Sequence, residues 1–207
     1  MKRFMMMFAV LCIGAILLAG SVLPGLSEER KVRAKIGILI KSNDQTMRAK
    51  SRDRLKAGDL LRIYVHPEVN SYIYVVHSDQ KNVTLLNMVE QKIQSSTLVL
   101  PSLREFYQVD GQSPGETFTI ICSPNEVKEV SPLLDSPLSH EKWSSVEKEL
   151  LKRGEIDLSQ KAERPFALMG NVRGGGDNGG GDPFVKELQI FSGIDILVKQ
   201  YEFTVKK

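Results

Sequence analysis

Short apolar runs separated by turn-forming residues recur along most of this chain. The runs are rich in Val, Ile, Tyr and Phe and end near Gly, Pro, Asn or Asp, which is typical of β-strands. The predicted strands cover residues 34–40, 60–66, 72–77, 83–86, 97–100, 104–109, 116–123 and 194–205. Short strands at this spacing predict a mainly β fold, an antiparallel β-sandwich of immunoglobulin-like or related topology.

One segment has helical rather than strand periodicity. Four apolar residues three or four positions apart predict a single inserted α-helix over 140–153: Trp143, Val146, Leu150 and Leu151. Ser139 suits the N-cap position of this helix, and Gly154 suits the C′ position just beyond its end.

Less regular segments follow the predicted helix. An apolar stretch covers 166–173, a glycine-rich loop covers 174–181, and a short element is expected over 183–191. No internal repeat is visible in the chain.

The first 27 residues have the three-part pattern of a secretory signal peptide. Lys2 and Arg3 precede an apolar run over 4–18, and small or turn-forming residues continue to Ser27. The apolar run is shorter than the roughly 20 residues that a stable membrane-spanning helix needs. The pattern therefore predicts export to the periplasm or the medium, with no membrane-spanning segment left after cleavage. The alternative is an uncleaved N-terminal anchor.

Small residues mark two possible cleavage positions. Gly25 and Ser27 favour a cut after residue 27, and Ala19 and Ser21 offer a second position. A bacterial lipoprotein needs a cysteine after Leu-Ala-Gly, but Ser21 stands there. Lipid anchoring is therefore not expected.

Cleavage after Ser27 leaves residues 28–207 as a single predicted domain. The cut removes two of the 28 basic residues and none of the 25 acidic ones, so the mature net charge is +1. Basic residues are concentrated in 28–56, but no aromatic residues are interleaved with them as in a nucleic-acid surface. We expect a solvated charged face and no nucleic-acid partner, with contact to anionic lipid, cell wall or another protein as the alternative.

Several motifs in the first half of the chain occur in a recognisable order. They are Leu55-Lys56-Ala57-Gly58-Asp59-Leu60-Leu61-Arg62-Ile63-Tyr64-Val65, Ser71-Tyr72-Ile73-Tyr74-Val75-Val76, Leu85-Leu86-Asn87, Leu100-Pro101 and Pro114-Gly115-Glu116-Thr117-Phe118. In this order they resemble the bacterial domain of unknown function 4384 family over about residues 55–123. The resemblance implies a β-rich module of exported or multidomain bacterial proteins, and it implies no catalytic residues.

Cys122 is the first candidate for chemistry. Export removes Cys12, so the mature chain cannot form an internal disulfide. A thiol nucleophile could use His66, His77 or His140 as its base. However, Cys122 shares a strand face with Phe118 and Ile120, which predicts a buried and unreactive thiol. We therefore expect no catalytic residue here.

The glycine-rich loop and the histidines give no clear metal or cofactor site. Asp177, Asn178 and Asp182 could offer oxygens to Ca²⁺, but their spacing matches no calcium-binding loop, so a connector is expected. The three histidines have no zinc-site spacing, and no Gly-x-Ser-x-Gly motif is present. We expect no metal and no cofactor.

Aromatic residues on the predicted strands offer a weak candidate surface for a ligand or partner. The residues of this surface are Arg62, Tyr64, His66, Tyr72 and Tyr74. Tyr64 is the strongest candidate for contact with a ligand or partner. It shares a strand face with Arg62 and His66, which we expect to be the wetter face. The alternative is that these tyrosines belong to a half-buried core.

These patterns favour an exported noncatalytic module that binds proteins or takes part in assembly in the bacterial cell envelope. Two other functions stay open. One is a hydrolase acting on envelope polymers, and the other is a small-ligand or sugar receptor. The receptor predicts a concave pocket near Tyr64, Tyr72 or Tyr74.

Overall fold

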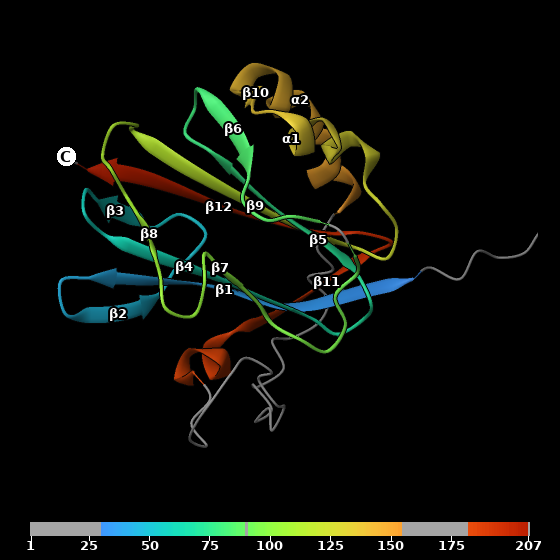
Figure 1. Cartoon of the computed structure of the whole chain (residues 1–207), viewed down its shortest axis with the longest axis horizontal. Coiled ribbons are helices and arrows are strands. Elements are labelled where there is room, and N and C mark those ends of the chain that lie inside the picture. Colours follow the sequence, from blue (N-terminus) through green and yellow to red (C-terminus); the bar gives the residue numbers. More distant parts are fainter. Residues whose placement is uncertain (1–29, 90, 155–181, 207) are drawn as a thin grey trace, which may run out of the picture.

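A computed structural model describes residues 30–89, 91–154 and 182–206 (Figure 1). The predicted signal peptide, the apolar stretch at 166–173 and the glycine-rich loop at 174–181 lie outside the described residues. Within them the fold is mainly β, with two facing sheets and short helices, and the predicted β-sandwich is confirmed.

Six of the described strands form the first sheet, which we call sheet A. Its order is β11-β1-β4-β7, with β2 paired to β1 and β8 paired to β4, and every pair is antiparallel. The strands are β1 (Lys31–Ser42), β2 (Gln45–Arg48), β4 (Leu60–Pro67), β7 (Leu98–Leu100), β8 (Tyr107–Gln108) and β11 (Gln189–Ile194).

The other six described strands form sheet B, in the order β10-β6-β5-β9-β12-β3. They are β3 (Arg54–Lys56), β5 (Tyr72–Ser78), β6 (Asn82–Leu85), β9 (Gly115–Ser123), β10 (Leu138–Ser139) and β12 (Leu197–Lys206). The β12–β3 pair is parallel, and it forms where the chain crosses from sheet A to the edge of sheet B for three residues.

The core lies between the two sheets and follows the alternation seen in the sequence. Ile36 and Ile38 of β1 and Ile63 of β4 face Val75 of β5 and Ile120 of β9, and all five side chains are fully buried. Side chains on alternate positions of a strand point to the same face, so each strand contributes every second residue to this layer.

Helices cover the outer face of sheet B (Figure 1). They are η1 (Lys128–Val130), α1 (Pro132–Asp135) and α2 (His140–Arg153). The predicted helix over 140–153 is confirmed as α2, and it buries Trp143 and Leu150 against the sheet.

The two helix ends differ from prediction in detail. Ser139 occupies the N-cap position of α2, but its side chain makes no capping hydrogen bond. Gly154 is the C-cap residue, with φ −91°, rather than the predicted C′ residue. A Cβ at Gly154 would lie 2.5 Å from Cγ2 of Val198, so close packing on β12 explains the glycine.

The outer face of sheet A is also covered. The short helix η2 (Pro183–Glu187) and the residue after it place Phe184 and Leu188 over Tyr64, which is completely buried. Gly37 of β1 makes room for this layer, because a Cβ there would lie 2.7 Å from Cδ2 of Leu188.

Two predicted strands are shorter or divided in the structure. Only Tyr107 and Gln108 of the run 104–109 form a strand, because the Ser102 side chain accepts backbone N–H bonds from Arg104 and Glu105 in a turn. The run 194–205 is divided at Asp195, whose φ of +61° turns the chain from β11 in sheet A into β12 in sheet B.

Candidate functional site

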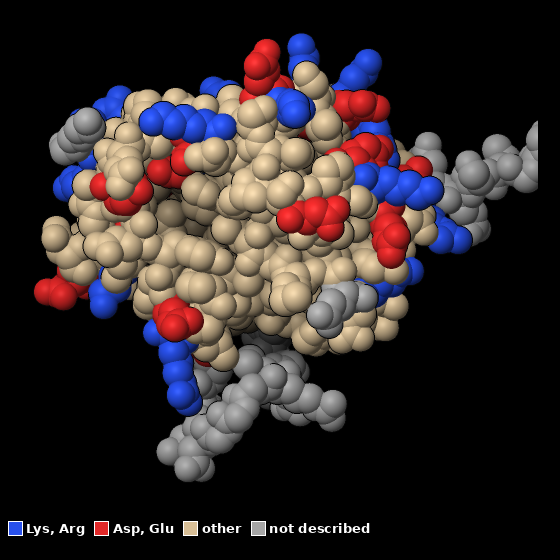
Figure 2. Space-filling model, turned by 45° about the horizontal axis from the view of Figure 1, so that its top comes forward, with Lys and Arg blue, Asp and Glu red and all other residues tan. Residues whose placement is uncertain are grey.

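A cleft of about 360 Å³ opens at one end of the sandwich, where β5 and β9 of sheet B meet the segment 107–113. Its buried floor is formed by Leu61, Val109, Ser113, Glu116 and Phe118. Half-buried His77, Asp79, Leu86 and Tyr107 form the walls, and exposed Lys81, Asn82, Gln108, Asp110 and Gln112 form the rim. The face turned forward in Figure 2 is hollowed on its left side, between acidic and basic side chains.

His77 and Glu116 form a close pair in this cleft. The two residues come from neighbouring antiparallel strands, and Nε2 of His77 lies 2.5 Å from Oε2 of Glu116. The His77 ring also packs on Phe118, with 4.8 Å between ring centroids. Both residues point to the face that is apolar farther along β5 and β9, so the sandwich interior becomes polar at this end.

Backbone contacts hold the polar groups around the pair. The Asp79 carboxylate accepts hydrogen bonds from the backbone N–H groups of Lys81 and Asn82. Burial acts to raise the pKa of Asp79, but these donors and nearby His77 outweigh it and lower the pKa below its usual value. Burial also raises the pKa of Tyr107, so its phenol stays a hydrogen-bond donor at neutral pH.

The cleft has the groups of a binding site, and its described lining residues include no activated hydroxyl or thiol nucleophile. Ser113 is the lining residue with an aliphatic hydroxyl, and its Oγ lies 2.7 Å from the backbone oxygens of Asp79 and Gly115. That geometry commits the hydroxyl proton to a carbonyl rather than to His77. In the part of the chain that the structure describes, no group of three or more His, Cys, Asp or Glu residues is placed to hold a metal ion.

Arg62 and Tyr64 lie in a different place from the one that the sequence suggested. The Arg62 guanidinium carbon sits 3.8 Å from the Phe106 ring centroid, and Nε donates to the backbone oxygen of Glu105. Tyr64 donates to the Asp182 carboxylate, and burial followed by this hydrogen bond raises the pKa of Tyr64 to about 12. The expectation that they occupy the wetter face is wrong, because η2 and the Phe106 segment cover it.

The other three residues of the predicted surface, His66, Tyr72 and Tyr74, make contacts of their own elsewhere. His66 is half-buried with Nδ1 3.1 Å from Oγ1 of Thr97, and burial and then Lys35 lower its pKa. Tyr72 is half-buried, with Nζ of Lys92 5.3 Å from its ring centroid.

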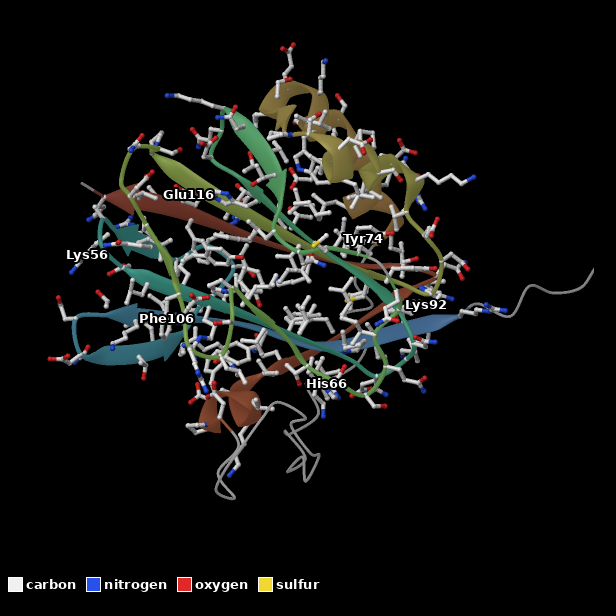
Figure 3. All side chains as sticks on the ribbon, in the orientation of Figure 1. Lys56, His66, Tyr74, Lys92, Phe106 and Glu116 are labelled. Atoms are coloured by element: carbon white, nitrogen blue, oxygen red, sulfur yellow. The ribbon has the colours of Figure 1, made fainter. Side chains whose placement is uncertain are left out.

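Tyr74 is buried under the helices, and its hydroxyl accepts the backbone N–H of Val127. Figure 3 shows Tyr74 and His66 on opposite sides of the sandwich, away from Glu116. None of the five predicted surface residues lines the cleft.

Sequence reasoning missed the pair at the centre of the cleft. The sequence suggests His77 only as a base for Cys122, and Glu116 only as part of a motif that begins a strand. A histidine and a glutamate at inward positions of otherwise apolar strands were the available signal. Their meeting depends on the register that pairs His77 with Phe118 across β5 and β9.

Comparisons with known proteins leave the chain without an identified relative. No family model, no curated protein and no solved structure matches it. The resemblance to the domain of unknown function 4384 therefore stays a prediction from the motifs. In the described residues no helix is long and apolar enough to span a membrane.

Proposed function

We propose that this chain is an exported β-sandwich module that binds a small polar ligand in the His77–Glu116 cleft without transforming it. The observation that carries the proposal is a hollow of about 360 Å³ with buried polar groups on its floor. Binding sites combine apolar walls with a few placed polar groups, and this cleft has both.

The contacts around the two candidate nucleophiles support a noncatalytic function. Cys122 is fully buried between the sheets, and burial raises the pKa of its thiol to about 12. Ser113 is hydrogen-bonded to backbone oxygens. Neither residue is a thiolate or an activated alkoxide, which a Cys or Ser nucleophile of acyl transfer requires.

The cleft favours the receptor over the protein-binding or assembly module that the sequence placed first. A predicted signal peptide places the ligand outside the cytoplasm, in the periplasm or the medium. The pocket differs from the predicted one in its location, since it is lined by His77 and Tyr107 rather than by Tyr64, Tyr72 or Tyr74.

The proposal is tested by NMR titration of the purified protein with three compound sets: neutral saccharides and polyols, small carboxylates, and small amines. We expect at least one set to shift the His77 imidazole and the Leu61 and Leu86 methyl signals in a saturable manner. The imidazole signals of His66 and His140 serve as internal references, since neither residue lines the cleft.

A matched pair of tryptophan variants locates the binding. Gln108→Trp adds bulk at the rim on β8, and Ser144→Trp adds the same bulk on the exposed side of α2. We expect the first variant to abolish the shifts and the second to keep them. If no compound set shifts the cleft signals, or if both variants bind equally, the proposal fails.

A further inference from the structure

Glu116 has one carboxylate oxygen that no protein group uses. Its side chain is 9% exposed, and His77 contacts only Oε2. Among the described residues no donor makes a hydrogen bond to Oε1. Oε1 is not among the fully buried atoms without a partner, so it remains accessible from the cleft. A carboxylate that is nine-tenths buried therefore presents a free acceptor to the cleft.

The charges around this acceptor differ sharply in burial. Lys81 and Asp110 stand on the exposed rim, where solvent and salt screen them. Glu116 is the one charged residue on the described floor, and among the described residues His77 is the basic group within ion-pair distance of it. A buried carboxylate is costly unless a cation and hydrogen bonds satisfy it, so the floor favours a positively charged ligand group.

The walls define the rest of the ligand. Apolar side chains of Leu61, Leu86 and Phe118 line the cleft beside Glu116. They suit a hydrocarbon stem, whose burial is favourable because it removes apolar surface from water. A hydrogen-bond donor is also needed, because only a donor can satisfy Oε1 directly. An ammonium group combines such a donor with the positive charge that the floor favours.

From these observations we infer that the cleft binds an aliphatic primary amine, with its ammonium group donating to Oε1 of Glu116 and its carbon stem against Leu61, Leu86 and Phe118. The inference rests on the proposed binding function and names its ligand class. A free diamine and a lysine side chain on a peptide share this chemistry.

Calorimetric titration of the purified protein tests the class with matched probes. The probes are hexane-1,6-diamine, uncharged hexane-1,6-diol, anionic adipate, tetramethylammonium as a cation without a hydrogen-bond donor, and a capped Gly-Lys-Gly peptide. We expect saturable binding of the diamine or the lysine peptide, and no binding of the diol, adipate or tetramethylammonium. The two amine probes separate a free amine from a peptide-borne one.

Glu116→Gln removes the charge and keeps the shape and the hydrogen bond to His77. We expect it to weaken amine binding about 10- to 100-fold, the range for losing a hydrogen bond between charged groups. Glu202→Gln is the control, since it makes the same charge change at an exposed position near Arg52. It should leave affinity within about twofold, as expected for a screened surface charge.

A wild-type measurement covers the case in which Glu116→Gln does not fold. The diamine should shift the His77 imidazole signal, and the diol should leave it unchanged. Binding of diol or adipate as tight as that of the diamine, or an unchanged affinity in folded Glu116→Gln, overturns the inference. If saccharides or carboxylates fill the cleft while both amine probes fail, the inference is wrong and the proposed binding function stands.

Discussion

Buried polar side chains in this protein are held by specific partners, and those partners set their chemistry. The Arg62 guanidinium is satisfied by the Glu105 backbone oxygen, the Tyr64 hydroxyl and the Phe106 ring, so it acts as part of the fold. Glu116 has a partner on one oxygen only. At the scale of residues, this difference separates a structural cluster from a candidate site.

Cys122 gives a prediction at the same scale. Burial raises the pKa of its thiol from 9.0 to about 12. Because the folded pKa is the higher one, thiolate formation opposes folding, so the folded state loses this contribution to stability as pH rises above about 9. We expect the native protein to react with a thiol reagent at least ~100-fold more slowly than the urea-unfolded protein throughout pH 7–9.

The labelling measurement includes its own control. The unfolded chain should react faster with each step in pH, as a free thiol does, while the folded chain stays protected. Rapid labelling of the folded protein would place Cys122 outside the core and reopen the hydrolase alternative.

At the scale of elements, the ends of α2 are set by packing on sheet B rather than by local capping. His140 donates its backbone N–H to the Lys81 oxygen, and its ring Nδ1 lies 2.8 Å from Oγ of Ser78. The helix is thus joined at its start to β5 and to the turn before β6, and Gly154 lies directly against β12 at its end. Such contacts stabilise a helix of this length more than its intrinsic propensity does.

Gly154→Ala should therefore lower the free energy of unfolding by about 1–3 kcal/mol, the usual cost of overpacking. The physical reason is a new methyl group 2.5 Å from Cγ2 and 2.8 Å from Cβ of Val198. Urea unfolding followed by tryptophan fluorescence measures the loss, since Trp143 lies in the same cluster.

Two further variants separate packing from helix propensity. Ser144→Ala changes an exposed position of α2 and should stay within about 0.5 kcal/mol of the wild type. In a Val198→Ala background the added cost of Gly154→Ala should shrink, because the clashing side chain is gone. An equal cost in both backgrounds would contradict the packing explanation.

At the scale of the whole molecule, the sandwich uses both ends of the described chain. β1 lies inside sheet A, and β12 lies between β9 and β3 in sheet B (Figure 1). Their side chains include Val32 at one end and Val205 at the other, and both are buried in the core between the sheets. The first residue of β1 is Lys31, four positions beyond the predicted cleavage point.

Expression of the full chain in a bacterium should yield a soluble periplasmic protein whose N-terminus is Glu28. The basic n-region and the short apolar run favour export, and Gly25 with Ser27 favours this cut. Intact-mass measurement of the periplasmic fraction identifies the N-terminus. Ser27→Leu places a bulky residue at the cut and should cause the precursor to accumulate. A full-length wild-type chain in the membrane fraction would support the anchored alternative instead.

Local patterns predicted much of the fold but little of the site. The run 72–77 became β5, and the run 140–153 became α2 with the bounds expected from apolar spacing. Alternation also placed Cys122 inside the sandwich, where the structure has it. The same alternation gave the wrong exposure for Tyr64, because a face is wet only if no other element covers it.

The sequence by itself determined which positions on each strand point the same way, since that follows from the two-residue repeat of an extended backbone. Tertiary structure alone decided what each face meets. Phe184 covers Tyr64 across 120 positions of chain, and His77 reaches Glu116 across 39 positions. Neither contact leaves a periodic trace, because strand register and the docking of distant segments depend on the packing of the whole sandwich.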